Sequence, residues 1–406
     1  MRRLWHSATL RSVAVLGLSG VGFAVANLAL ARALPTEEYA LLTLVVALVN
    51  VGYPLAAAGV DGVVNRRKLE AGPRLLRRLL HALVPVALVF SAIGLAGYGT
   101  TLPVALMILL CTMAGGAVLV AGGQFQSEQR FGISLALNQS PNLILLLSAA
   151  WVLAAGSRGA ETPLAVWTAG FLLVAALGWW LLFRERHAKP DRSVEFPWSE
   201  ALAIAGLAAG GLFLIQLERL LLPYLLPLEE LATYGVLAAI AGSLFRVLQM
   251  GVGYSLLPRL RAAPGVIERR RLIFKEARLV VAVVALGSLV IWVATPRIEE
   301  WFLGGKYHLS SALVLAAVLT GVAKVLNGFA QSAVSALADQ RELSLVSVLG
   351  WLAVGLAAVG AVAGARWGLP GVIYGVGLGW VMRASVGLLL AARHLRLPAA
   401  PQAVTP

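Results

Sequence analysis

Residues 102–123 read LPVALMILLCTMAGGAVLVAGG, an apolar run of 22 residues without a charged side chain. About 20 such residues in a helix cross the hydrocarbon core of a bilayer, so this stretch predicts a membrane span. Comparable runs bounded by charges, proline or glycine recur along the chain. They do not alternate apolar and polar residues, which argues against a transmembrane β-barrel. The predicted spans are 12–31, 39–60, 79–98, 102–123, 133–155, 163–183, 201–222, 231–256, 279–295, 311–336, 344–364 and 369–392.

The composition fits a chain that lies mostly within a membrane. Hydrophobic residues make up 59% of the 406 residues, charged residues 13%, and the mean hydropathy is +0.84. An average soluble domain is about half apolar and about one quarter charged. A soluble enzyme, a disordered chain and a disulfide scaffold are therefore excluded. Cys111 is the only cysteine, so neither an internal disulfide nor a cysteine-rich metal site is expected.

The distribution of lysine and arginine predicts the orientation. With the N-terminus inside, the inner connections hold 24 of the 33 basic residues and the outer connections hold five. Cytoplasmic loops carry such an excess, so both termini are expected to be cytoplasmic. The same rule accounts for most of the net charge of +14 without a nucleic-acid partner. The run 12–31 exceeds the ~7–15 residues of a signal-peptide core, and we interpret it as the first span.

The two halves of the chain share short motifs in the connections between spans. The sequence LPTEE at 34–38 is echoed by LPLEE at 226–230, and the basic loop 66–78 is echoed by 259–278. Six spans per half is an even number, so both halves enter from the same side, as in parallel transporter repeats. We therefore expect two six-helix lobes, 1–190 and 191–406. The alternative is that connections between helices share such acidic and basic residues by chance.

Three cations lie deep within predicted spans of the second half. A charge at a helix centre costs about 2.5–3.5 kcal/mol on insertion scales, so it calls for a cavity, a partner or snorkelling. Arg246 is followed one turn later by Gln249, and Lys324 is followed at i+3 by Asn327. With Arg383, these residues are predicted to line a path for an anionic group, because guanidinium forks suit phosphate oxygens. Snorkelling of Arg383 to the inner interface is the alternative.

Four further residues are candidates for substrate binding or for ion coupling. Arg219, near the outer end of its span, is interpreted as a substrate-binding residue, as the partner of an acid or as a residue that reaches the outer interface. Arg32, near the outer end of span one, is a cavity residue or an interface anchor. Glu218 is the only carboxylate inside a span, and Asp61 lies at a span boundary. Either acid is a candidate for coupling to H⁺ or Na⁺, while Glu218 beside Arg219 is equally suited to a simple ion pair.

Short motifs in order along the chain resemble a known family. These are RALP at 32–35, FLGGKY at 302–307, ADQR at 338–341 and GLPGV at 368–372. Together they resemble the polysaccharide transporter branch (Wzx-type oligosaccharide flippases) of the multidrug/oligosaccharidyl-lipid/polysaccharide exporter superfamily. The resemblance implies twelve helices in two lobes that form a V around a cationic cavity, in a bacterial or archaeal cytoplasmic membrane. It implies alternating-access transport of polyprenyl-pyrophosphate-linked sugar units of O-antigen, capsule or exopolysaccharide, beside polymerase or glycosyltransferase machinery.

Two rival functions remain open. A multidrug exporter of the same superfamily would favour acidic cavity groups for cationic drugs, whereas this sequence has four intramembrane cations and one acid. A membrane-embedded glycan polymerase or transferase would need a catalytic cluster. The five histidines are scattered, and no metal spacing, nucleophile elbow or phosphate-binding loop is present. We therefore expect a transporter without catalytic residues or a cofactor.

Overall fold

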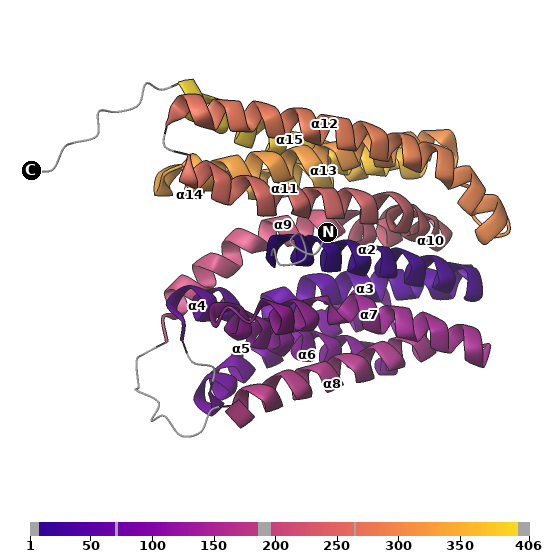
Figure 1. Ribbon diagram of the computed structural model, residues 1–406. Coiled ribbons are helices and arrows are strands. Elements are labelled where there is room, and N and C mark those ends of the chain that lie inside the picture. Colours follow the sequence, from indigo (N-terminus) through magenta and orange to yellow (C-terminus); the bar gives the residue numbers. More distant parts are fainter. Residues whose placement is uncertain (1–7, 70–71, 186–195, 264, 397–406) are drawn as a thin grey trace, which may run out of the picture. The chain divides into compact units, whose positions relative to one another are not determined.

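The computed structural model describes residues 8–69, 72–185, 196–263 and 265–396, and within them every regular element is helical (Figure 1). The chain forms two compact units, Met1–Val236 and Leu237–Pro406. The lobe boundary at 190/191 stays a prediction. Five of the basic residues counted in the inner connections lie outside the described residues: Arg2, Arg3, Arg186, Lys189 and Arg192.

Unit 1 consists of long helices that run beside one another in alternating directions. Its elements are α2 (Ala8–Ala33), α3 (Thr36–Ala56), α4 (Val60–Arg67), α5 (Pro73–Ala92), η1 (Ile93–Gly97), α6 (Leu102–Ser127), α7 (Phe131–Ala155), α8 (Glu161–Glu185), α9 (Trp198–Leu225) and α10 (Leu228–Leu237). α3 and α6 are buried along most of their length. They therefore form the apolar centre of this unit.

Unit 2 has α13 at its centre, packed against α11 and α15. Its elements are η2 (Ala238–Gly242), α11 (Ser243–Ala262), α12 (Val266–Arg297), η3 (Ile298–Phe302), α13 (Ser311–Leu337), α14 (Gln340–Gly364), η4 (Ala365–Trp367) and α15 (Gly368–Arg396). η1, η2 and η3 are π-helical segments, of which η1 and η3 follow α5 and α12 at the C-terminal ends of these helices. This correspondence agrees with the sequence repeat.

Each predicted span overlaps a helical stretch of the structure, and span eight, 231–256, lies over α10, η2 and α11, which follow one another without a break. Among the described residues, ten stretches are long and apolar enough to cross a membrane, and one of them, Arg341–Arg396, contains both α14 and α15. Gly17–Ala33 of α2 is a shorter apolar helix. The all-α, multi-pass architecture predicted from the sequence is therefore confirmed.

Several helix boundaries differ from the prediction, for example that of α5, which begins at Pro73 and not at 79, and two of the differences bear on the arguments below. Span two does not continue to residue 60, because the chain breaks after Ala56 with positive φ at Ala58 and Gly59. A Cβ at Gly59 would overlap the carbonyl oxygen of Ala201 on α9, so this close approach requires glycine. The other difference is α12, which begins at Val266 and not near 279, so its basic first turns belong to the helix.

Candidate functional site

The structure separates the four intramembrane cations into two groups. Arg219 belongs to unit 1, whereas Arg246, Lys324 and Arg383 belong to unit 2. Arg219 is buried in a polar cluster that also contains a carboxylate. Unit 2 has six carboxylates, and all of them lie outside its predicted spans: Glu268, Glu276, Glu299, Glu300, Asp339 and Glu342. The two groups therefore have different electrostatic surroundings.

The polar cluster of unit 1 is built on one turn of α9, which we call the α9 cluster. It contains Gln216, Glu218 and Arg219, whose side chains are all buried, and Glu218 is only 1% exposed. The Nη1 atom of Arg219 donates a hydrogen bond to Oε1 of Gln216 at 3.0 Å. This contact rules out the interface-anchor interpretation of Arg219, because the guanidinium is held inside the protein.

Two tyrosines complete the α9 cluster. The hydroxyl of Tyr234 on α10 hydrogen-bonds the carboxylate of Glu218, and the charge of Arg219 acts on both Tyr234 and the buried Tyr39 of α3. A Cβ at Gly235 would lie 2.7 Å from Oγ1 of Thr43 and 3.1 Å from a ring carbon of Tyr39. α10 and α3 are therefore in close contact at the cluster, and the carboxylate is held by a phenol next to a guanidinium.

Asp61 does not join the α9 cluster. It lies in the first turn of α4, whose N-cap Gly59 contacts the start of α9 at Ala201. Glu218 lies 17 residues beyond Ala201, or about 25 Å along the helix at 1.5 Å per residue. Burial raises the pKa of the Asp61 carboxyl, while hydrogen bonds from the backbone N–H groups of Gly62 and Asp61 oppose the rise. The two acids are therefore separate sites at opposite ends of α9.

Lys324 of unit 2 lies against an aromatic ring. Its Nζ atom is 5.6 Å from the ring centroid of Trp380, which is buried on α15. Asn327, one turn further along α13, is also buried. The two helices are held together beside this pair, since Oγ1 of Thr320 donates to the carbonyl oxygen of Ile373 at 3.3 Å. Lys324 and Asn327 therefore share a polar stretch of α13, as predicted, next to a tryptophan that the sequence did not single out.

Arg383 lies on a different side of α15, toward α14. Its Cζ atom is 3.8 Å from the position that a Cβ of Gly350 would occupy. Nε and Nη1 of Arg383 are buried and, within the described part of the chain, have no hydrogen-bond partner. Buried N–H groups normally find a partner in protein, water or ligand. A guanidinium with two such groups is therefore suited to an anion.

Arg246 lies in the first turn of α11, directly after the π-helical segment η2, and its side chain is exposed. π-helical segments inside α-helices are frequent at functional sites. Gln249, one turn on, faces α13, because a Cβ at Gly328 would lie 2.6 Å from its Cγ atom. The two residues stay one turn apart in α11, with Gln249 against α13 and the Arg246 side chain exposed, and their common role in a substrate path stays a prediction.

Arg32 is exposed in the last turn of α2. It is not part of the α9 cluster. Its two interpretations therefore both remain predictions.

The sequence did not indicate the uncharged tyrosines that lie beside Glu218 and Arg219. Tyr234 and Tyr39 follow the two LPxEE motifs, and each lies in a helix that begins just after the motif proline. Tyr39 directly follows its motif and Tyr234 comes four residues after its own, so a tyrosine in the first turns after each motif is the signal that could have identified them. The Arg66–Glu200 and Arg67–Glu200 ion pairs, at 3.2 and 2.5 Å, join α4 to the first turn of α9 and had no comparable signal.

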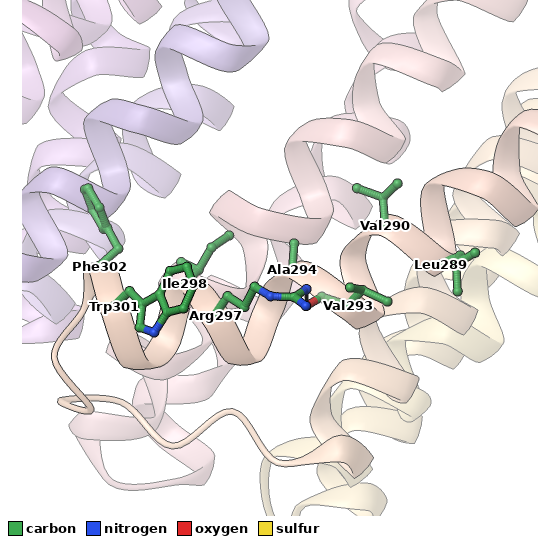
Figure 2. A pocket seen from close by; sticks show the side chains of 8 residues that line it. All are labelled: Leu289, Val290, Val293, Ala294, Arg297, Ile298, Trp301 and Phe302. Carbon is green, nitrogen blue, oxygen red and sulfur yellow. Dashed lines mark hydrogen bonds between the residues drawn. The ribbon is translucent and has the colours of Figure 1, made fainter.

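An apolar cavity of about 690 Å³ lies elsewhere, along α12 and η3 (Figure 2). Its lining comprises Leu289, Val290, Val293, Ala294, Arg297, Ile298, Trp301 and Phe302. Arg297 is the one charged residue among them, and its Nη1 atom donates to the carbonyl oxygen of Val293 at 3.0 Å. The candidate cations do not line this cavity, and we do not assign it to the transport path. The described residues contain no group of three or more His, Cys, Asp or Glu suited to a metal ion.

Comparison with solved structures identifies the fold. A MATE transporter in the bent conformation matches with a TM-score of 0.57 and 13% identity, over 97% of both chains. A variant of the Vibrio cholerae MATE transporter VcmN matches with a TM-score of 0.59 and 17% identity, over 95% of both chains. The lipid II flippase MurJ, in its inward closed conformation, matches with a TM-score of 0.64 and 10% identity, over 94% of this chain and 87% of that one.

The chain has the fold of MATE transporters and MurJ. One of the matched MATE transporters is described as a member of the MOP superfamily, and the all-helical, two-lobe fold expected for this chain is the fold of these structures. No family model and no curated protein matches the sequence. The similarity does not distinguish the polysaccharide branch from the drug exporters, and the choice of substrate depends on the residues of this chain.

Proposed function

We propose that this protein is a flippase for lipid-linked oligosaccharides, which moves polyprenyl-pyrophosphate-linked sugar units across the cytoplasmic membrane by alternating access. The observation that supports this proposal is the charge pattern of unit 2. Its predicted spans contain Arg246, Lys324 and Arg383 and no carboxylate. A transport path lined by positive charges favours an anionic cargo and disfavours a cationic one.

Each of the three cations has a chemical reason to meet a pyrophosphate. Arg383 has two buried N–H groups that lack a partner among the described residues, and a phosphate oxygen would satisfy them. The charge of Lys324 lies near Trp380, which orients the ammonium without neutralising it. The side chain of Arg246 is exposed and is available to a passing headgroup. A water-filled path would also remove most of the cost of placing these charges in the membrane.

We further propose that Glu218 couples transport to H⁺ or Na⁺. It is the only carboxylate within a predicted span, is 1% exposed, and is held by the Tyr234 hydroxyl beside Arg219. A carboxylate enclosed in this way changes its interactions with both neighbours when it gains a proton or a cation. Such a change is what a coupling site requires.

The alternative function is drug export, which the shared fold with MATE transporters supports equally well. A cationic drug would need an accessible acid on the path. Glu218 is the one intramembrane acid, and it is enclosed by the α9 cluster. The charge pattern therefore favours the flippase. A membrane-embedded glycan polymerase or transferase remains the rival from another functional class.

The decisive experiment is deletion of the gene, followed by analysis of lipid-linked glycans. The proposal predicts accumulation of a polyprenyl-pyrophosphate oligosaccharide in the cytoplasmic leaflet, reversed by the wild-type gene. Unchanged glycans together with drug hypersensitivity would establish the exporter instead. Accumulation of single units on the outer face would indicate a polymerase, because flipping would then be intact.

A further inference from the structure

The first turns of α12 extend beyond the membrane-spanning part of that helix. α12 has 32 residues, which at 1.5 Å per residue is about 48 Å. The hydrocarbon core of a bilayer is only about 30 Å thick. The apolar part of α12 begins after Arg278, so the preceding turns lie at the level of the headgroups or beyond them.

One face of these turns combines basic and apolar side chains, all of them exposed. We call it the α12 basic face, and it consists of Ile267, Arg270, Arg271, Phe274, Lys275 and Arg278. The spacing i, i+3, i+4, i+7, i+8 and i+11 places them on one side of a helix. Ile267 is 86% and Phe274 65% exposed, so the two apolar side chains are not used to pack this unit. Glu268 is the one exposed acid in these turns.

Two contacts fix the direction of this face, one on the buried side of α12 and one made by Arg270 at the edge of the face. The buried Glu276 forms an ion pair with Arg259 of α11 at 2.5 Å. Nε of Arg270 donates a hydrogen bond to the carbonyl oxygen of Leu395 at the end of α15. Glu276 is neutralised by Arg259 on the buried side of α12. It therefore does not cancel the positive charge of the α12 basic face.

The α12 basic face continues directly into the apolar surface of the same helix. Leu279, Leu286 and Leu289 are exposed further along α12, followed by the hollow that Figure 2 shows toward Trp301. In a membrane-spanning helix, exposed leucines of this kind face lipid tails. The basic residues therefore lie at the level of the phosphates of the lipids that cover the apolar surface of α12.

We propose that the α12 basic face binds anionic phospholipid headgroups of the leaflet at the N-terminal end of α12. The guanidinium and ammonium groups of Arg271, Lys275 and Arg278 contact the phosphates, and Ile267 and Phe274 enter the interface between headgroups and tails. Clusters of basic residues next to a spanning helix attract anionic lipids in this way. This goes beyond the positive-inside pattern, which requires basic residues in the loop but not on one lipid-facing side of a helix.

The test uses the full-length protein in phosphatidylcholine bilayers that contain spin-labelled phosphatidylglycerol or spin-labelled phosphatidylcholine. The immobilised fraction of each label gives its relative affinity for the protein surface. Wild type should prefer phosphatidylglycerol, and R271Q/K275Q/R278Q should lower that preference at least about threefold. High salt should weaken the wild-type preference, because it screens exposed charges. The charge-matched control R158Q/K306Q/R366Q removes three exposed bases elsewhere and should leave the preference unchanged.

Three results would overturn the proposal. These are equal affinity of wild type for both labels, an unchanged preference in R271Q/K275Q/R278Q, and an equal loss in the control. If the triple variant does not fold, K275Q and R278Q are measured singly, and no loss in either also overturns it. R271K/R278K retains the charges and should retain the preference, so a loss there would count against an electrostatic site.

Discussion

The ammonium nitrogen of Lys324 lies 5.6 Å from the ring centroid of Trp380. The indole is almost fully buried between the helices of unit 2. A cation over an aromatic face gains about 0.5–2 kcal/mol. A carboxylate in the same place would bind the ammonium and cancel its charge, whereas the ring orients it and leaves the charge in place. This arrangement suits a side chain that must bind an anion and release it again.

Lys324→Ala should therefore abolish flipping while the protein remains folded and inserted. Lys324→Arg should retain part of the activity, because the positive charge is preserved. The assay is accumulation of lipid-linked oligosaccharide in a deletion strain that expresses each variant at equal level. Lys306→Ala, at an exposed lysine in the loop before α13, is the matched control and should behave as wild type. Wild-type transport by both Lys324→Ala and Arg246→Ala would contradict the anion path.

Arg383→Gln should lower transport about 10- to 100-fold, since hydrogen bonds to charged groups contribute about 1.5–3 kcal/mol. Arg383→Lys should recover only part of this, because an ammonium cannot reproduce the guanidinium fork. Transport rates in proteoliposomes with a polyprenyl-pyrophosphate substrate provide the measurement. Equal rates for wild type and Arg383→Gln would mean that Arg383 serves only the packing of α15 against α14.

Glu218→Gln should remove the dependence of transport on an ion gradient without unfolding the protein. The amide is nearly isosteric with the carboxylate but cannot take up a proton or bind a cation in the same way. Tyr234→Phe keeps the carboxylate and removes its phenol, so it should shift the ion dependence and not abolish it. Transport is measured with and without a pH or sodium gradient. If Glu218→Gln keeps the wild-type dependence, this carboxylate is structural.

Much of the fold could be predicted because membrane spans are recognised from the length and composition of their apolar runs. Residues 102–123 are a span in any context, and the helix that contains them runs from Leu102 to Ser127. The extent of α12 could not be predicted in the same way. Its basic first turns have the composition of a loop, and they are held as helix by contacts such as Glu276 with Arg259.

The candidate charges could be located along the chain but not paired across helices. The sequence shows that Glu218 and Arg219 are an acid and a base next to each other. Their contact with Tyr234 depends on how α10 packs against α3 and α9, which no local pattern encodes. The surroundings of Arg246 and Gln249 could not be predicted for a related reason. Gln249 packs against Gly328 of α13, whereas the Arg246 side chain one turn before it is exposed, and the contact with Gly328 depends on how the two helices pack.

Gly371→Ala should destabilise unit 2 through direct backbone contact. A Cβ at Gly371 would overlap the carbonyl oxygen of Gly364 on α14, and a Cβ at Gly364 would overlap that of Gly371. Overpacking of this kind costs about 1–3 kcal/mol. Thermal unfolding in detergent should therefore begin at a lower temperature. Gly355→Ala on α14 is the control, because a Cβ there meets nothing within 4 Å, and it should leave stability unchanged or raise it slightly.

Asp61→Asn should stabilise the protein at neutral pH. Burial raises the pKa of this carboxyl above its ordinary value of 3.8, so the folded protein holds the proton more tightly than the unfolded chain does. The stabilising contribution of the protonated form is complete below about 3.8 and is lost as pH rises through the folded pKa. At neutral pH the wild type therefore carries a buried charge that the amide of the variant lacks.

The measurement for Asp61 is the difference in unfolding temperature between wild type and Asp61→Asn across a pH series. The variant should be more stable at pH 7, and the difference should shrink as the pH falls toward 4. Glu268→Gln removes an exposed carboxylate and should show no such convergence. A constant difference at every pH would show that the aspartate acts through its hydrogen bonds at the start of α4 and not through its charge. Asp61 would then be a structural residue that holds the short helix against α9, and its place as a coupling candidate would be lost.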